Sequence, residues 1–456
     1  MFDRLQDLGL LVARPGRYSL DHALRKRSPA DPVAVADGVI AGCIVAALLA
    51  ILPTPAAAAS QEALTSRIDG VRTASAAGEH ELALARADSL VAWAPGHPYA
   101  VMTSAIAHAA AGRDARVEAD LRVLLRWDPR YARDALEELE LARLRARFPR
   151  VDSLAARAER PVSRGTVWAV LSERDLVLEG TTWDPATRSL LVGSLNKNTV
   201  IAVAPDGSAR DRVARGDHGL GSVVGIHVDT LRRLLWVAST PRYDDPADTT
   251  AAALFAFDAA TGEFRRRVVT GLRPSFPNDL TTGLDGTVYA TDSRAERVLV
   301  LPPGATAFET LPTSTPFVSP NGITISDDGR LLFVSDLDHI RVVSLADGRD
   351  WRLAVPDSIE VSGIDGLAYA NGSLIAHHPL EYWRIARYAL DESRERIIGV
   401  EYIEWSSPDT RTSTTGEVVG DHYYYIGNGQ LDRMNAGTID AATMEPIRLY
   451  RVRLGP

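Results

Sequence analysis

Hydrophobic and polar positions alternate in short bursts through the C-terminal two thirds of this chain. A short phrase restarts six times, and each time it is followed by a turn and an apolar run. The phrases occupy residues 178–183, 224–229, 277–280, 320–323, 364–367 and 414–417. The apolar runs occupy residues 190–193, 234–238, 287–290, 331–334, 373–376 and 423–426. The restarts come about every 43 to 54 residues, the length of a four-stranded propeller blade. The pattern predicts a mainly β fold, a six-bladed β-propeller over residues 161–456.

The two ends of this region predict how the ring closes. The last restart supplies only three strands, at residues 417–420, 423–426 and 447–454. A spare strand at residues 166–171 precedes the first restart. It can complete the sixth blade, which would remove the edges that an open sheet exposes.

Residues 60–160 have a different pattern, rich in Ala, Leu, Arg and Glu and without strand-like alternation, which predicts helices. Several residues recur 34 positions apart: Gly78 and Gly112, Ala85 and Ala119, Leu90 and Leu124, Trp93 and Trp127, Pro95 and Pro129. This is the period of a tetratricopeptide (TPR) repeat. We expect two TPR-like repeats, a capping helix over residues 131–148 and a linker at 160–165. Because at least three repeats are usually needed for stability, the segment should pack on the ring or on a partner. It is either a helical spacer or a protein-binding groove.

The N-terminal residues 1–59 resemble a targeting segment. A basic cluster at residues 25–27 precedes an apolar stretch at 38–52 and an Ala-x-Ala ending, which predicts a signal peptide cleaved after Ala59 and an exported, periplasmic or secreted protein. The alternative is an uncleaved membrane anchor, for which the apolar stretch is slightly short. Cleavage would remove Cys43, the only cysteine, so a metal would have to be held by oxygen or imidazole ligands.

Charge and motifs exclude several classes of function. A formal charge of −9 and a pI near 5.6 argue against a nucleic-acid partner. The sequence has no phosphate-binding loop, dinucleotide fingerprint or Gly-x-Ser-x-Gly elbow, which argues against nucleotide-dependent enzymes and serine hydrolases.

Four of the six restarts carry side chains that bind metals, namely Glu179, Asn278, Asn321 and Asp365, whereas the second and sixth offer Gly225 and Thr415. Equivalent positions of successive blades converge on the axis of a ring. Two carboxylates and two amide oxygens suit Ca²⁺ best, with Mg²⁺, Mn²⁺ or Zn²⁺ as alternatives. The competing interpretation is that Asn and Asp at strand starts bond the nearby backbone.

These motifs resemble the senescence-marker-protein/gluconolactonase/luciferin-regenerating-enzyme family of six-bladed propellers. The matching residues are Glu179–Gly180–x–x–Trp183, Pro277–Asn278–Asp279, Pro320–Asn321–Gly322 and Asp365–Gly366. The resemblance implies that Glu179, Asn321 and Asp365 hold a divalent cation, that Asn278 holds substrate or metal-bound water, and that Asp365 doubles as general base. It also implies hydrolysis of a lactone or similar ester. Thr181 stands where the family usually has Pro. The basic residue that would orient a substrate near the third blade is not clearly placed, so a sugar-acid substrate does not carry over.

The ends of the second strands return to the face where the inner strands begin. Ser194, Asn196, Asp292, Asp336, His377, His378 and Asn428 should therefore surround the same mouth. We expect Asn278, Asp292, His377, His378 and Asn428 to contact substrate. The alternatives are that the two histidines lie in an exposed loop and that Asp292 and Asp336 cap turns. Only one of two successive strand residues can face the channel. His227, within a strand, is expected to be structural.

Two functions are consistent with these features. The first is an exported, metal-dependent hydrolase in which water attacks a metal-polarised lactone or ester carbonyl. The second is a non-enzymatic propeller that binds a ligand or protein, with a structural cation and a protein partner recruited by the helices.

Overall fold

The computed structural model describes residues 59–455 apart from 139–140, 244, 246, 272–273, 380–381, 436–437 and 440. Except for Ala59, the first residue of α4, the predicted targeting segment with Cys43 lies outside the described residues. Within the described residues, no helix is long and apolar enough to cross a membrane.

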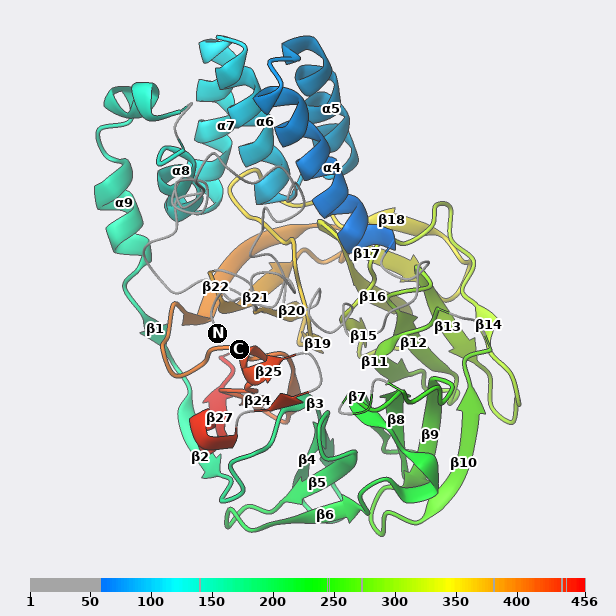
Figure 1. The fold of residues 1–456 in the computed structure, drawn as a ribbon. Helices are drawn as coiled ribbons and strands as arrows, with labels where there is room; N and C mark the ends of the chain where they lie inside the picture. Colours follow the sequence, from blue (N-terminus) through cyan, green and yellow to red (C-terminus); the bar gives the residue numbers. More distant parts are fainter. Residues whose placement is uncertain are drawn as a thin grey trace.

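Six antiparallel sheets surround a common axis (Figure 1). Blade 1 contains β3 (Leu178–Asp184), β4 (Ser189–Ser194), β5 (Thr199–Val203) and β6 (Ala209–Val213). Blade 2 contains β7 (Ser222–Asp229), β8 (Leu234–Thr240), β9 (Ala253–Asp258) and β10 (Phe264–Val269). Blade 3 contains β11 (Pro277–Thr282), β12 (Val288–Asp292), β13 (Arg297–Leu301) and β14 (Glu309–Thr310). Blade 4 contains β15 (Ile323–Ile325), β16 (Leu331–Asp336), β17 (His339–Ser344) and β18 (Asp350–Arg352).

The last two blades each take a strand from the region before the first restart. Blade 5 contains β19 (Leu367–Ala370), β20 (Ser373–His378), β21 (Arg384–Leu390), β22 (Ile397–Trp405) and β1 (Val162–Ser163). Blade 6 contains β23 (Gly416–Val419), β24 (His422–Ile426), β27 (Arg448–Arg453) and β2 (Thr166–Val170). A small hairpin, β25 (Met434–Asn435) and β26 (Thr438–Ile439), lies between β24 and β27. The six-bladed propeller predicted from the sequence is confirmed.

The ring closes as the sequence predicts, with a strand from before the first blade completing the last one. The inner strands contact one another in chain order from β3 to β23, and β23 contacts β3. Strand β2 pairs with β27 as the outermost strand of blade 6. Apolar residues of blades 1 and 6 share one cluster, in which Trp183 stacks on Tyr424 with ring centroids 5.7 Å apart. The predicted linker at 160–165 is partly wrong, because Val162 pairs with Trp405 and Ser163 donates a hydrogen bond of 3.0 Å to Glu404 Oε1.

Helices precede the ring: α4 (Ala59–Ala76), α5 (His80–Trp93), α6 (Pro98–Ala110), α7 (Asp114–Trp127), α8 (Pro129–Ala135), η1 (Ala142–Arg147) and α9 (Val151–Ala158). The two helical pairs repeat the same turn. Gly78 follows α4 and Gly112 follows α6, both in the left-handed conformation, with φ of 75° and 70°. The single capping helix predicted over 131–148 is wrong. The chain turns after Ala135, and Leu136, Leu144 and Phe148 fold back onto the core of α6 and α7.

The helical segment (residues 59–158) packs on the ring beside blades 4 and 5 (Figure 1). Leu337 and Val318 join the apolar core of α4 to α6, and Gly96 N–H donates a 2.9 Å hydrogen bond to Asp338 Oδ2. The guanidinium of Arg130 lies over the rings of Tyr382 and Trp405. These ring residues lie before an inner strand, between second and third strands or, for Trp405, at the end of the fourth strand of blade 5. The helices therefore cover the face on which the inner strands begin.

Candidate metal centre

Close backbone contacts between blades fix which residues are equivalent around the axis. A Cβ added to Gly225 would lie only 2.3 Å from the carbonyl oxygen of Asn278 in the next blade. The same contact recurs at three other junctions: Gly180 with Val224 O at 2.4 Å, Gly322 with Asp365 O at 2.3 Å, and Gly366 with Thr414 O at 2.4 Å. Only glycine allows the inner strands to approach so closely. The equivalent residues are therefore Glu179, Val224, Asn278, Asn321, Asp365 and Thr414.

This register corrects the sequence alignment by one residue in two blades. Val224 and Thr414, not Gly225 and Thr415, stand in line with the four candidate ligands. Thr415 instead fills the glycine position of blade 6. Its Oγ1 donates a 2.6 Å hydrogen bond to Glu179 O, and Thr414 Oγ1 donates to the same oxygen at 2.9 Å. Blade 6 thus joins blade 1 by hydroxyl bonds at the start of the inner strands.

The four predicted ligands occupy equivalent positions at the starts of four inner strands, and three of them carry a buried oxygen without a partner among the described residues. Glu179 and Asp365 are 2% and 1% exposed, and Asn278 and Asn321 are also buried. Among the residues that the structure describes, Glu179 Oε2, Asn278 Oδ1 and Asp365 Oδ2 have no hydrogen-bond partner. Asn321 Nδ2 donates to Asp365 Oδ1 at 2.9 Å. Buried acceptors are rarely left unpaired because their desolvation is costly, so three at equivalent positions are what a site for a cation or an ordered water would leave. We call these four residues the axial cup.

A short relay fixes the amide of Asn278 in the axial cup. Its Nδ2 donates a 3.1 Å hydrogen bond to Ser293 Oγ, which donates onward to Pro320 O at 2.6 Å. Because the amide nitrogen is occupied, its oxygen is the atom that remains available. The same relay ties blade 3 to the residue before Asn321.

The electrostatics of the axial cup favour a cation. Burial raises the pKa of Glu179 well above its usual value, and the charges of Asp365 and Asp279 add to the shift. Burial also raises the pKa of Asp365 to about 7, against the hydrogen bond from Asn321 and with a contribution from Asp279. The carboxylates thus repel one another in a poorly solvated place. A bound cation would remove this penalty.

Sequence reasoning missed Asp279, although it carries a signal in the repeated phrase. Asp279 occupies the position that is glycine in four other blades. Burial raises its pKa to about 7, while hydrogen bonds from Leu280 N–H and Ile323 N–H act in the opposite direction. The carboxylate therefore bonds the inner strand of blade 4 and adds negative charge beside the cup.

The donor set of the axial cup fits a hard cation. Within the described parts of the chain, His, Cys, Asp and Glu side chains do not gather in threes as a metal site. Binding would therefore depend on the amide oxygens of Asn278 and Asn321 together with the two carboxylates. Mixed carboxylate and amide oxygens suit Ca²⁺, and Mg²⁺ or Mn²⁺ after it, better than Zn²⁺.

The polar side chains at the ends of the second strands bond the backbone. Asn196 Oδ1 accepts a hydrogen bond from Val177 N–H at 2.8 Å, and Asp292 Oδ1 accepts one from Phe276 N–H at 2.7 Å. Asp336 Oδ1 accepts one from Val318 N–H, in the connection that leads to the inner strand of blade 4, at 2.6 Å. The turn-capping alternative therefore describes Asp292 and Asp336, and Asn196 bonds the backbone in the same way.

The remaining rim asparagine has the same kind of partners. Asn428 Nδ2 donates to Pro446 O at 3.1 Å, and its Oδ1 accepts from Arg448 N–H at 2.8 Å. Its amide thus bridges two backbone sites in the connection between β24 and β27. Substrate contact by Asp292 or Asn428 stays a prediction.

Both histidines of the predicted rim pair are buried in β20, so the exposed-loop interpretation is wrong. They point to opposite sides of the strand, as expected. His377 Nε2 lies 2.7 Å from Tyr423 Oη, and His378 Nε2 lies 2.9 Å from Tyr388 Oη. Burial lowers the pKa of His377 to about 3, so its ring is neutral at physiological pH. Their predicted contact with substrate is untested.

His227 agrees with its predicted structural role. Its Nε2 lies 3.1 Å from Thr282 Oγ1 of the next blade. Burial lowers its pKa to about 4. The ring is neutral at physiological pH and joins two inner strands.

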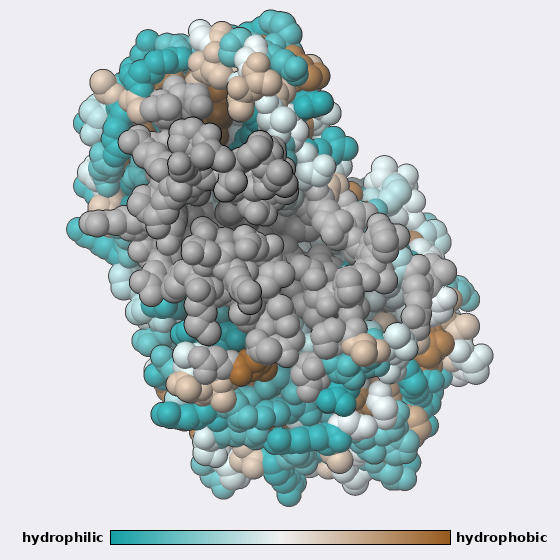
Figure 2. Space-filling view, in the orientation of Figure 1, coloured by the Kyte–Doolittle hydropathy of each residue, from teal (hydrophilic) through white to brown (hydrophobic). Residues whose placement is uncertain are grey.

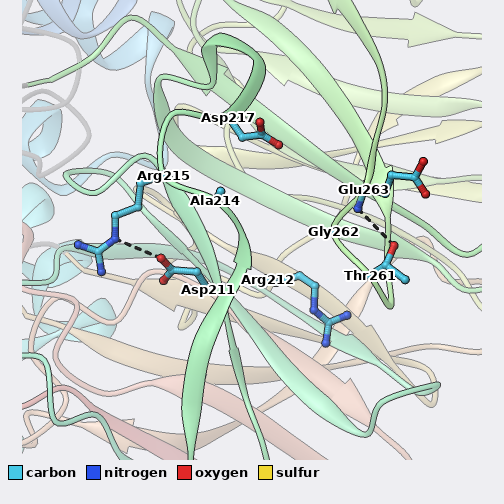
Figure 3. Close-up of a pocket in the computed structure, with 8 residues that line it drawn as sticks. All are labelled: Asp211, Arg212, Ala214, Arg215, Asp217, Thr261, Gly262 and Glu263. Atoms are coloured by element: carbon cyan, nitrogen blue, oxygen red, sulfur yellow. Dashed lines mark hydrogen bonds and ion pairs between the residues drawn. The ribbon is translucent and has the colours of Figure 1, made fainter.

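A shallow hollow lies at the outer strands of blades 1 and 2 (Figure 3). It has a volume of 570 Å³ and is lined by charged side chains of both signs, including Arg215, whose Nε donates to Asp211 Oδ2 at 3.3 Å. None of the predicted site residues lines it. Over the lower blades in this view, the visible surface is mostly hydrophilic, with apolar residues in small groups (Figure 2).

No protein-family model matches the sequence, and no curated protein matches it. Solved structures of similar fold include the PQQ-bound aldose sugar dehydrogenase of Streptomyces coelicolor, with 14% identity, 64% of this chain and 99% of that chain covered, and a TM-score of 0.46. They also include the gluconolactonase XC5397 of Xanthomonas campestris, with 17% identity, coverage of 65% and 96%, and a TM-score of 0.45. A luciferin-regenerating enzyme has 14% identity, coverage of 64% and 95%, and a TM-score of 0.45. A gluconolactonase and a luciferin-regenerating enzyme, which give their names to the family that the motifs resemble, are thus among these structures. At such values the likeness decides nothing about activity.

Proposed function

We propose that this protein is an exported, divalent-cation-dependent hydrolase of a lactone or related ester. One observation supports the proposal: three buried oxygens, at equivalent inner-strand positions of blades 1, 3 and 5, have no hydrogen-bond partner among the described residues. The axial cup would hold the cation through Glu179, Asn278, Asn321 and Asp365.

The reaction requires one water molecule for each ester bond. The water oxygen adds to the carbonyl carbon, the acyl C–O bond breaks, and a water proton ends on the released alkoxide oxygen. A cation in the cup would polarise the carbonyl and stabilise the developing oxyanion.

Asp365 is the candidate to take the proton from water and return it to the leaving oxygen. The hydrogen bond from Asn321 holds one carboxylate oxygen and leaves the other unpaired. Ser293 orients the amide of Asn278, and the two threonines of blade 6 fix the backbone of Glu179.

The second candidate is a binding propeller whose cation is structural. It is favoured by the deep burial of the cup, since Glu179 and Asp365 are almost inaccessible. In this alternative the cation joins blades 1, 3, 4 and 5, and the helical segment recruits a protein partner.

The test combines metal analysis with a hydrolysis screen. The purified protein should contain about one divalent cation per chain, and Glu179→Gln should reduce that content. A panel of lactones and aryl esters should be hydrolysed before chelation, not after it, and again when Ca²⁺ is restored. Asp347→Asn, in an exposed turn, is the control and should behave as the parent protein. Metal-dependent thermal stabilisation without turnover across the panel would overturn the hydrolase in favour of the binding propeller.

A further inference from the structure

The helical segment contacts the ring through equivalent positions of its two repeats (Figure 1). Gly96, in the turn between α5 and α6, donates its N–H to Asp338 Oδ2 at 2.9 Å. Arg130 follows Gly96 by 34 residues, the period of the repeat, and its guanidinium lies 4.0 Å from the ring centroid of Tyr382. Asp338 belongs to blade 4 and Tyr382 to blade 5. Successive helical repeats therefore dock on successive blades, and these two blades also supply the hydrogen-bonded pair of the axial cup.

The contact at Gly96 is a close approach of two backbones. A Cβ added to Gly96 would lie 2.6 Å from the carbonyl oxygen of Asp338. The backbone of Gly96 does not have the positive φ that favours glycine, so the nearness of the ring alone excludes a side chain there. Leu337 and Val318 pack beside this contact, in the apolar core of α4 to α6. The α5–α6 turn is thus fitted closely to blade 4.

The part of blade 4 that receives this turn also supports the cup. We call residues 335–338, the end of β16 and the turn that follows it, the blade-4 hairpin. Asn321 N–H donates to Ser335 O at 3.1 Å, and Ser335 Oγ donates to the carbonyl of the residue before Asp365 at 3.2 Å. Gly363 N–H, two residues before Asp365, donates to Leu337 O at 3.3 Å. A movement of the hairpin would therefore shift Asn321 and Asp365 together.

Resting on the cation site of the proposed function, we infer that docking of the α5–α6 turn on the blade-4 hairpin is coupled to cation binding in the axial cup. A cation constrains Asn321 and Asp365 from the axis, and the helices hold the hairpin behind them. Each therefore stabilises the arrangement that the other requires. Such coupling is reciprocal, so each event strengthens the other by the same factor. The helical segment then regulates the cup and is more than a spacer.

The first experiment measures amide hydrogen exchange in the parent protein at single-residue resolution. Gly96 N–H donates across the interface to Asp338 Oδ2, whereas His97 N–H donates to Ala94 O within the same turn at 3.2 Å. Saturating Ca²⁺ should slow exchange at Gly96 about tenfold and leave exchange at His97 nearly unchanged. Equal slowing at both amides, or no slowing at Gly96, would overturn the coupling.

The second experiment measures the calcium Kd of a variant by titration well below its melting temperature. Gly96→Ala places a methyl group against Asp338 O and should raise the Kd about tenfold. Gly70→Ala in α4 is the matched control, because its added Cβ meets only the side chain of Arg86, at 3.8 Å, and it should keep the parent Kd. Leu121→Ala removes a fully buried side chain from the core of α6 and α7. It should lower stability without changing the Kd.

The outcomes separate this inference from the proposed function. If the parent protein binds no divalent cation, both fail. If it binds Ca²⁺ but hydrolyses no ester, the hydrolase is overturned and the coupling stands or falls by the two measurements, since neither uses turnover. If Gly96→Ala keeps the parent Kd, or if Leu121→Ala loses as much affinity, the cation site stands and the coupling is overturned. If Gly96→Ala does not fold, the exchange measurement on the parent protein decides.

Discussion

Asn321 Nδ2 donates a 2.9 Å hydrogen bond to Asp365 Oδ1, which leaves Asp365 Oδ2 buried and without a partner in the described part of the chain. The two residues lie 44 positions apart, each two residues before the inner strand of its blade, blade 4 for Asn321 and blade 5 for Asp365. The bond fixes the plane of the carboxylate and decides which oxygen remains available. Burial nevertheless dominates, since the pKa of Asp365 is raised to about 7. A cation beside this carboxylate would favour its charged form and lower the pKa again.

Replacing Asp365 by Asn should separate stability from function. In the absence of divalent cations, Asp365→Asn should melt at a higher temperature than the parent protein, because a repelling buried charge is removed. Calcium at one hundred times its Kd should raise the unfolding free energy of the parent by about 2.7 kcal/mol, and with it the melting temperature. The melting temperature of the variant should stay almost unchanged. Esterase activity should fall by about 10²–10⁴-fold. A calcium-dependent shift of equal size in both proteins would contradict the assignment of Asp365 to the cup.

The close contact at Gly225 predicts a steric effect on the cup. In Gly225→Ala the new methyl would meet Asn278 O at 2.3 Å and Asp279 Cα at 2.7 Å. Overpacking of this kind costs about 1–3 kcal/mol and should also move Asn278, so calcium affinity should fall with stability. Gly399→Ala is the matched control, because Gly399 also lies in a strand but has nothing within 4 Å of its added Cβ. Thermal unfolding and calcium titration measure both effects, and equal behaviour of the two variants would refute the register.

Arg130 predicts how firmly the helical segment is held to the ring. It is buried, paired with Asp128 at 2.5 Å, and hydrogen bonded to Ser406, and it lies 4.0 Å from the ring centroid of Tyr382. Arg130→Met removes the counter-ion of the buried Asp128 carboxylate, which keeps only its N-cap hydrogen bond from the backbone N–H of residue 130, and this should cost about 3–5 kcal/mol.

The consequence for Arg130→Met should be local to the interface. Limited proteolysis should cut between residues 158 and 165 faster than in the parent. Arg126→Met, at an exposed position of α7, should change neither stability nor cleavage. Unchanged cleavage in Arg130→Met would mean that the apolar contacts around Leu337 suffice to hold the segment.

The parts of the structure that the sequence predicts are those that depend on periodicity. The repeated phrases predict the blade count, the role of β2 and the equivalent positions of Glu179 and Asp365. In a closed ring, equivalent positions of successive blades face the same axis. The correct register at Val224 cannot be predicted from the sequence alone. It is set by the close approach of two backbones at Gly225, and the local sequence shows only that a glycine is present there.

Partners across blades are harder to predict than strands. The turn-capping roles of Asn196, Asp292 and Asp336 depend on the path of the preceding connection, whose length differs from blade to blade. The break after Ala135 depends on the core that α6 and α7 offer. Such choices are made by tertiary packing and override the local helical preference of residues 131–148.

His97 predicts a loss of stability in acid. It is the N-cap of α6, its Nδ1 accepts from Tyr99 N–H at 3.3 Å, and burial lowers its pKa from 6.5 to about 4 against the charge of Asp338. Between these pH values the unfolded chain binds a proton that the folded chain does not. Stability is therefore complete above pH 6.5 and is lost as the pH falls towards 4, by about 1.4 kcal/mol at pH 5.5. His97→Asn keeps a good N-cap residue without the titration, so its unfolding free energy should fall less between pH 7.5 and 5.5. Asp336, whose pKa is raised to about 6, has the opposite effect in both proteins and cancels in the difference. Denaturant unfolding at these two pH values measures the difference, and equal losses in parent and variant would show that His97 is not a neutral buried group.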